Sequence, residues 1–553
     1  MGLLIDLFGY ASIILHGLTI AAQSVAFGSA LFVVLLAHPL APSVANGPLI
    51  LQQSRRIATV SAVALVFFEA AGLGLQVTVL ASTLSLPLFE LAGANFAVAG
   101  LMKISIASSL AIALCSRESR ARPAILLGLV LAGLAVATLT THANARLDHR
   151  APLLVIEGLH QFGAAIWIGG LPCFLLALAR VKEANAFRRI GARYSRMSMA
   201  GVTCILVSGI VMMVFFVGDA SGFYGTAYGV MVGAKITIFL FLLALGGMNF
   251  LLIERLRNAP NISVIRLKRF AEVEFGLGLT IFFAAASLTS VPPAVDLTQD
   301  RVTLQEIAER NAPKWPVLTS PDHATLALAE LQSRVDANAT TEADPPPAYV
   351  PGSGQLPPRN AADIAWSEYN HHWAGLFVLA AGLGAMLSRA GLRAGRHWPL
   401  LFLGLAAFIS IRSDPEVWPL GNEGLLESLR DVEVLQHRLF VLLITALAIF
   451  EWRVQARDAR QSRAALGFPL LCAVGGALLL THTHAIANIK DQLLIELTHT
   501  PLALASVLAG WSRWLELRLD PRDDNGWGNR IAGWIWPFCL VFIGWLLLSY
   551  REA

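Results

Sequence analysis

Charged residues are scarce in this chain of 553 residues: Asp, Glu, Lys and Arg make up only 14% of it, while 56% is hydrophobic. A soluble globular protein carries about 25% charged residues, and charge is most costly inside a lipid bilayer. The shortage therefore excludes a soluble enzyme, a disordered scaffold and a coiled coil. The net charge of +4 forms no basic patch, which argues against a nucleic-acid-binding protein.

Cysteine is also rare. The five cysteines stand singly in apolar segments, and no Cys-x-x-Cys occurs. This pattern offers neither a thiolate metal site nor a redox pair, and small buried hydrophobes are the expected role. The first residues lack a basic segment, so we expect the first apolar run to be a retained span rather than a cleaved signal peptide.

Long apolar runs, by contrast, recur along the whole chain. Because a helix needs about 20 apolar residues to cross a bilayer, they predict an all-α, polytopic integral membrane protein with about fourteen transmembrane helices. The predicted spans are 10–36, 57–81, 98–115, 123–141, 152–178, 197–217, 231–252, 273–291, 371–387, 398–411, 432–452, 466–481, 491–511 and 531–548.

Basic residues set the orientation of these spans. Most Lys and Arg residues fall in alternate loops, whereas residues 1–9, 82–97 and 218–230 carry none. The positive-inside rule places the basic loops in the cytoplasm and both termini outside. One long exterior segment, about 292–370, ends in a proline-rich stretch typical of a linker, and it separates eight spans from six.

The first eight spans contain a faint repeat. Leu101–Ser105 resembles Gly233–Thr237, and Leu139–Thr141 resembles Leu288–Ser290. Because four spans restore the original side of the membrane, these segments predict a parallel four-plus-four repeat. Chance matches between apolar sequences are the alternative.

Histidine is distributed unevenly across the two sides. Ten of the thirteen histidines fall on the exterior side or in the outer half of a span: His16, His142, His149, His160, His371, His372, His437, His482, His484 and His499. Any single one could be a hydrogen-bonded core residue. Together they predict a metal or haem site, because polar groups in a membrane usually mark function and imidazole is the commonest metal ligand.

Carboxylates accompany several of these histidines. Glu157, Glu368 and Glu496 each precede a histidine by three residues, and Glu433 precedes His437 by four. Either spacing puts both side chains on one helix face, where the carboxylate could orient the imidazole or bind metal itself. The repeated Glu-x-x-His pattern is also typical of di-metal carboxylate proteins. A pair such as His437 with His499, or His16 with His160, could instead hold haem b.

Two lysines also lie inside predicted spans. Lys103 and Lys235 stand about a turn inside the outer boundary. Their side chains could extend to the membrane surface, or Lys103 could pair with a buried partner such as Glu69.

The first half resembles the copper-resistance protein D (CopD/PcoD) family. The resemblance rests on Thr141-His-Ala143 and on Glu157-Gly-Leu-His160 followed by Trp167-Ile-Gly-Gly-Leu171, with weaker matches at Leu15-His16, at Ala227-Tyr-Gly229 with Lys235, and from Phe275 to Pro293. Thr141 and Glu157 stand where the family has glycine and aspartate. The likeness covers about residues 10–295.

The resemblance implies a bacterial inner-membrane protein of copper handling that works with a periplasmic copper chaperone. It implies a CopD-like membrane domain at 1–295, with metal candidates His16, His142 and His160, Glu157 as orienting group and Trp167 as a packing residue. Residues 296–368 would then be a periplasmic segment, and 369–553 an additional six-helix domain. The candidates in that domain are His371, His372, His437, Glu433, His482, His484, Glu496 and His499.

We therefore expect a copper transporter toward the cytoplasm, or a membrane copper acceptor, rather than an enzyme. A haem-b membrane cytochrome and a di-metal oxidase in the second half are the alternatives.

Overall fold

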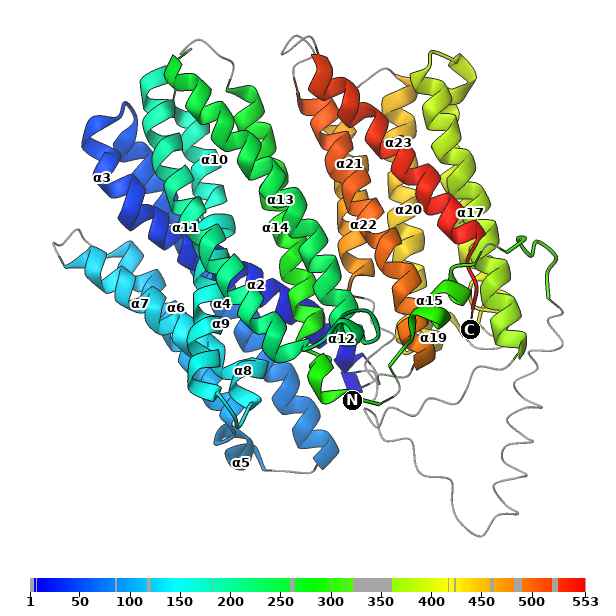
Figure 1. Ribbon diagram of the computed structural model, residues 1–553, viewed down its shortest axis with the longest axis horizontal. Coiled ribbons are helices and arrows are strands. Elements are labelled where there is room, and N and C mark those ends of the chain that lie inside the picture. The colour runs from blue at the N-terminus through cyan, green and yellow to red at the C-terminus, as the bar shows by residue number, and fades with distance from the viewer. Residues whose placement is uncertain are drawn as a thin grey trace. The chain divides into compact units, whose positions relative to one another are not determined.

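Helices dominate the computed structural model (Figure 1). The residues that the structure describes are 4, 5, 7–84, 87–116, 121–181, 183–258, 264–299, 301–312, 314–321, 361–415, 417–421, 424–457, 462–481, 490–519 and 526–552. Among them, thirteen helices are long and apolar enough to cross a membrane, and a shorter apolar helix covers Arg463–Leu479. The prediction of an all-α polytopic membrane protein is confirmed.

The chain forms two compact units, Met1–Phe223 with Met231–Asp296, and Tyr224–Val230 with Leu297–Ala553. The main helices of unit 1 are α2 (Phe8–Phe32), α4 (Gly47–Leu84), α6 (Asn95–Cys115), α7 (Arg122–Ala137), α9 (Arg150–Ala164), α10 (Leu171–Arg180), α11 (Ala184–Phe216), α13 (Ala227–Asn258) and α14 (Ile265–Leu288). Its shorter elements are η1 (Val33–Ala37), α3 (His38–Leu40), η2 (Ala41–Ser43), α5 (Leu88–Ala92), η3 (Thr138–Thr140), α8 (His142–Ala145), η4 (Ala165–Gly169), α12 (Ala220–Tyr224) and η5 (Ala294–Asp296).

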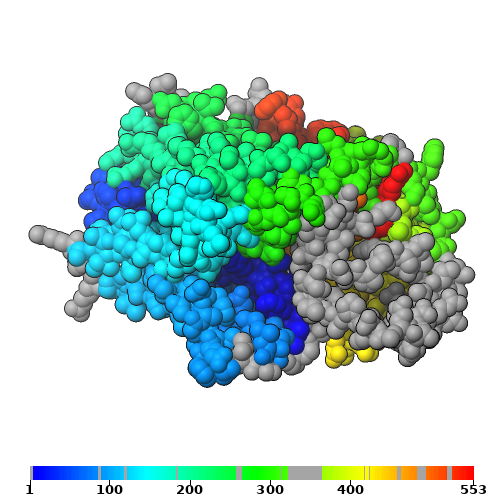
Figure 2. Space-filling model, turned by 60° about the horizontal axis from the view of Figure 1, so that its bottom comes forward, coloured from blue at the N-terminus to red at the C-terminus, as the bar shows by residue number. Residues whose placement is uncertain are grey.

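Helix α2 is one of the most buried helices of unit 1, together with α14 and the span formed by α9, η4 and α10. Of its most apolar stretch 67% is buried, against 11% for α4, and α2 packs on α4, α14 and η4. Seen from the end at which the chain begins, the dark blue start of α2 lies between the blue end of α4 and the green end of α14 (Figure 2). An apolar helix enclosed in this way forms the core of its bundle.

The crossing of α2 with η4 depends on two glycines. A Cβ atom on Gly169 would lie 1.8 Å from the Ser24 carbonyl oxygen, and one on Gly28 would lie 2.0 Å from that of Ala165. Small residues allow membrane helices this close approach. The η4 segment is a π-helical turn between α9 and α10, and the buried Tyr194 hydroxyl donates a hydrogen bond to its Trp167 carbonyl. Such bulges occur frequently at functional sites.

We expect Gly169→Ala to destabilise unit 1 by about 1–3 kcal/mol, because the added methyl group must force two backbones apart. Gly128→Ala in α7 is the matched control, since a Cβ there meets nothing within 4 Å. Thermal unfolding of the two purified variants gives the comparison. Equal stability of the two variants would contradict the close crossing.

Unit 2 contains α15 (Leu304–Arg310), α17 (Ala361–Arg389), η7 (Arg393–His397), α18 (Leu400–Arg412), α19 (Leu425–Ser428), α20 (Val432–Ala456), η8 (Arg463–Leu466), α21 (Gly467–Leu479), α22 (Lys490–Arg518) and α23 (Trp527–Leu548). Its six long helices form a closed ring, because α17 packs on α18, α18 on α20, α20 on α21, α21 on α22, α22 on α23, and α23 back on α17. Glycines on α17 and α23 permit the closest of these contacts, and a Cβ on Gly544 would lie 2.4 Å from the Leu379 nitrogen.

A buried charge network joins four helices of this ring. Arg513 of α22 donates hydrogen bonds to Glu451 of α20 at 2.8 Å and to Glu516 at 2.7 Å. Glu516 also pairs with Arg389 of α17 and accepts a hydrogen bond from Trp536 of α23 at 2.7 Å. Arg513 is only 1% exposed. Two arginines therefore balance two glutamates in this network, of which Arg389 is the partly exposed member.

Candidate metal site

The six-helix ring of unit 2 encloses a cavity of about 580 Å³ that is lined by side chains from all six helices. Most of the lining is apolar, but three histidines face it from three different helices: His371 of α17, His437 of α20 and His499 of α22. A mostly apolar cavity with a few convergent polar groups is typical of a binding site. We call this the three-histidine cavity.

His371 and His499 lie next to each other in this cavity. Their ring centres are 5.6 Å apart and their planes are nearly perpendicular, at 89°. Two imidazoles on one metal ion, each with a metal–nitrogen distance of about 2.0 Å, have ring centres roughly 5–6 Å apart. Tyr550 stacks on the His371 ring at 3.9 Å. The spacing of the pair thus fits one shared ion.

The hydrogen bonds of these two rings decide which nitrogen could bind the ion. Nδ1 of His371 lies 2.8 Å from the Ser367 carbonyl oxygen, and Nδ1 of His499 lies 2.8 Å from that of Ile495. A carbonyl oxygen only accepts, so Nδ1 carries the proton in both rings. Nε2 is then the nitrogen with the lone pair that a metal requires.

The third histidine, His437, is oriented by a carboxylate. Its Nδ1 lies 2.7 Å from Oδ1 of Asp414, and the other carboxylate oxygen, Oδ2, accepts a hydrogen bond from the Ser413 hydroxyl. Burial raises the pKa of Asp414, but the hydrogen bond and charge of His437 outweigh burial and hold it below its ordinary value. The ionised Asp414 therefore holds the Nδ1 proton of His437. This is the carboxylate–histidine arrangement that supports metal ligands in proteins.

The carboxylates that the spacing had singled out have other contacts. Glu368 pairs with Lys314 and accepts a hydrogen bond from the Glu552 backbone at 3.3 Å. Glu433 lines the cavity, and Glu496 is buried, with one carboxyl oxygen lacking a partner among the described residues. The orienting groups are instead the backbone carbonyls of Ser367 and Ile495, together with Asp414. Asp414 stands 23 positions from its histidine, and no local spacing signals it.

The remaining histidine candidates of unit 2 lie elsewhere. His372 is completely buried, and both of its ring nitrogens are used: Nδ1 accepts a hydrogen bond from the Val317 backbone at 2.8 Å, and Nε2 donates to the Tyr550 carbonyl at 2.8 Å. These bonds give His372 a structural role. His482 and His484 lie outside the described residues.

The histidine candidates of unit 1 have separate partners. His160 Nδ1 lies 2.9 Å from the Ser208 hydroxyl, and His142 Nε2 lies 3.4 Å from the Leu288 carbonyl. Burial lowers the pKa of His142, which keeps it neutral at neutral pH. Glu157 accepts a hydrogen bond from Gln161 at 2.9 Å rather than orienting His160. Within the described parts of both units, no three His, Cys, Asp or Glu side chains form a group that could hold a metal ion.

Lysines lie near two of the histidine candidates of unit 1. Lys103 pairs with Glu69 at 3.2 Å, which confirms the predicted partner, and its charge acts on His16. The charge of Lys235 acts on His160. A nearby ammonium group repels a metal cation. The histidines of the three-histidine cavity experience three carboxylates, Asp414, Glu433 and Glu552, and two arginines, Arg310 and Arg438. His142 of unit 1 likewise experiences carboxylates, those of Glu157 and Asp296.

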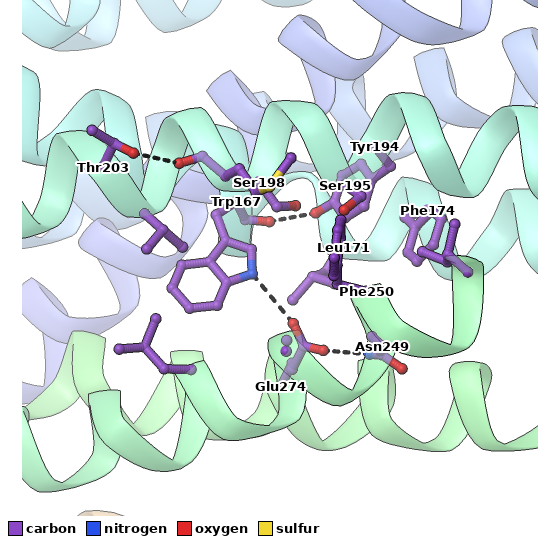
Figure 3. A pocket seen from close by; sticks show the side chains of 16 residues that line it. Trp167, Leu171, Phe174, Tyr194, Ser195, Ser198, Thr203, Asn249, Phe250 and Glu274 are labelled. Atoms are coloured by element: carbon purple, nitrogen blue, oxygen red, sulfur yellow. Dashed lines mark hydrogen bonds between the residues drawn. The ribbon is translucent and has the colours of Figure 1, made fainter. Parts of the chain in front are cut away.

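Trp167 of unit 1 does more than the packing expected of it. It is 2% exposed, and its indole nitrogen donates a hydrogen bond to Glu274 of α14 at 3.2 Å (Figure 3). The sequence gives no signal for Glu274, because it lies at the beginning of a predicted span, 273–291, where a glutamate is usually solvated.

Comparisons with known proteins give an independent indication of the family. The family model described as "Copper resistance protein D" matches residues 188–288. "Copper transport protein CutJ" of Bacillus subtilis (strain 168) is 28% identical over 163 residues, which are 29% of this chain and 29% of that relative. No solved structure matches the chain. Residues 188–288 of this chain, which has the apolar helices of a polytopic membrane protein, are therefore similar to the copper resistance protein D family.

Proposed function

We propose that this protein takes up copper from outside a bacterial inner membrane, moves it toward the cytoplasm, and binds the ion in the three-histidine cavity. The observation that carries the proposal is the pair His371 and His499, whose ring centres lie 5.6 Å apart with both Nδ1 atoms already bonded to backbone carbonyls. Imidazole nitrogen suits copper. The copper ion is cargo, and a periplasmic copper chaperone is the expected donor.

The roles of the side chains follow from their contacts. His371 and His499 would bind the ion through Nε2. His437 lines the same cavity from α20, and it would supply a third nitrogen only after side chains move, because the described residues hold no ready-made group of three such ligands. Asp414 would hold the His437 ring in place. The carboxylates of Asp414, Glu433 and Glu552 near these histidines would favour a cation electrostatically.

Elemental analysis and an absorption spectrum of the full chain, purified in detergent after growth with copper, test this function. We expect one or two copper ions per chain and no Soret band. A Soret band would identify a haem protein, and two irons without copper would identify a di-metal oxidase; either result would overturn the proposal.

Uptake into proteoliposomes distinguishes transport from acceptance alone. With copper added outside vesicles that contain the full chain, we expect copper to enter the lumen faster than in protein-free vesicles. Copper that stays bound to the protein without entering would show a membrane copper acceptor and contradict the transport part of the proposal.

We expect Asp414→Asn to weaken copper binding by about 10–100-fold, which is the usual effect of removing a group that orients a metal-bound histidine. Asp431→Asn is the control: Asp431 lines the same cavity but caps α20 through the backbone nitrogens of Glu433 and Val434, and asparagine caps equally well. Competition with a copper chelator measures both affinities. Equal copper affinities of the two variants would show that Asp414 does not orient a copper ligand.

A further inference from the structure

A second cavity, of about 430 Å³, lies in unit 1 around the carboxyl group of Glu274 (Figure 3). Its walls come from η4, α10, α11, α13 and α14. Glu274 is 3% exposed and belongs to a helix long and apolar enough to cross a membrane. An ionisable side chain in such a position usually marks a functional site.

The Glu274 carboxyl group is held by neutral donors. Trp167 Nε1 donates to Oε2 at 3.2 Å, and the Asn249 amide donates to Oε1. Trp167 and Asn249 are themselves 2% and 6% exposed. Two donors fix the carboxyl orientation toward the cavity, but they supply no full positive charge.

No cation balances Glu274 within the described residues. The cavity lining contains no Lys, Arg or His, and its only other titratable group is the Tyr194 hydroxyl, which donates to the Trp167 carbonyl. No ion pair of Glu274 occurs among the described side chains, and no charged side chain there acts on it. A buried carboxylate without a counter-charge is very costly, so Glu274 requires a proton or a bound cation.

The Glu274 cavity also contains an oxygen atom without a hydrogen-bond partner among the described residues. The Asn249 side-chain oxygen is buried and has no hydrogen-bond partner in the described part of the chain. The hydroxyl groups of Tyr194 and Ser198 line the same space. Carboxylate, amide and hydroxyl oxygens are the ligands of hard cations, whereas the cavity presents no imidazole.

We propose that the Glu274 cavity binds a small hard monovalent cation, either a proton on the Glu274 carboxyl group or a sodium ion between the Glu274 and Asn249 oxygens. Tyr194, Asn249 and Glu274 all lie within the residues that match the family model. The site is separate from the three-histidine cavity and does not depend on the copper proposal.

Two measurements test this site. Each is made on the full chain in detergent, with the natural protein and the variants Glu274→Gln and Glu272→Gln. The first is the infrared band of a protonated carboxylic acid as pH is varied; the second is the thermal midpoint as NaCl replaces choline chloride. Glu272 lies on the same helix and pairs with Arg269, so its variant is a matched control. Neither measurement involves copper, so this proposal can fail while the copper function stands.

A carboxylic acid band at neutral pH that is lost in Glu274→Gln but kept in Glu272→Gln would identify the proton. A midpoint that rises with sodium in the natural protein and in Glu272→Gln, but not in Glu274→Gln, would identify sodium. An ionised carboxylate with no sodium effect would overturn the proposal. If Glu274→Gln fails to fold, Trp167→Phe removes one donor and must shift the pH midpoint of the band or the sodium response; no shift would also overturn it.

Discussion

Replacing either His371 or His499 by alanine will lower the copper affinity of the protein by at least about 100-fold, more than the 10–100-fold expected for an orienting group. The reason is that the two rings are adjacent, with centres 5.6 Å apart, and that each Nδ1 donates a hydrogen bond to a backbone carbonyl of its own helix. If both Nε2 atoms bind one ion, removal of either side chain leaves that ion with only one of the two imidazole ligands. Competition with a copper chelator on the purified full chain measures the loss.

The double variant, with both His371 and His499 replaced by alanine, tests more directly whether the two side chains bind the same ion. Two side chains that share one ion act as a unit, so their effects are not additive. We expect His371→Ala with His499→Ala to bind copper little more weakly than either single variant. His397→Ala, which removes an exposed histidine of the same unit, is the control and should leave affinity unchanged. Unchanged affinity in both single variants, or additive losses in the double variant, would contradict a shared ion.

Replacing Arg513 by methionine will destabilise unit 2 by about 3–5 kcal/mol, the usual cost of removing one partner from a buried ion pair. Arg513 donates to both Glu451 and Glu516 while only 1% exposed. Its removal leaves two buried glutamates with one remaining arginine, Arg389. The free energy of unfolding of the full chain, measured by denaturant titration in detergent, gives the magnitude.

A second substitution should restore most of this loss. Arg513→Met with Glu451→Met leaves Arg389 and Glu516 as a balanced pair, and apolar replacements of a whole buried ion pair are often neutral in stability. We therefore expect the double variant to be more stable than Arg513→Met alone. A single variant as stable as the natural protein, or a double variant less stable than the single, would show that charge balance does not govern this network.

The membrane spans could be predicted from sequence because their signal is local. Each predicted span has its helix, but the helices are often longer than predicted: α4 runs over Gly47–Leu84, where 57–81 was expected. Apolar length marks only the part that lipid would surround, and a helix can continue beyond it with polar residues. The closure of six helices into a ring depends instead on distant contacts, such as Gly544 against Leu379, which no local pattern encodes.

The site could be predicted only in part. The one-sided distribution of histidines pointed to His371, His437 and His499, because an imidazole in an apolar helix is conspicuous. Their orienting groups were not predictable from the Glu-x-x-His spacing. A ring on a helix can donate to the carbonyl four residues earlier without any glutamate, and Asp414 reaches His437 from a separate segment.

The most direct test of copper binding in the three-histidine cavity is X-ray absorption at the copper edge on the copper-loaded full chain. We predict scattering from imidazole nitrogens at about 2.0 Å, with fewer nitrogen neighbours in His371→Ala and in His499→Ala. Sulfur scattering from methionine or cysteine, or an imidazole signal that both variants leave unchanged, would place the copper elsewhere and contradict the account.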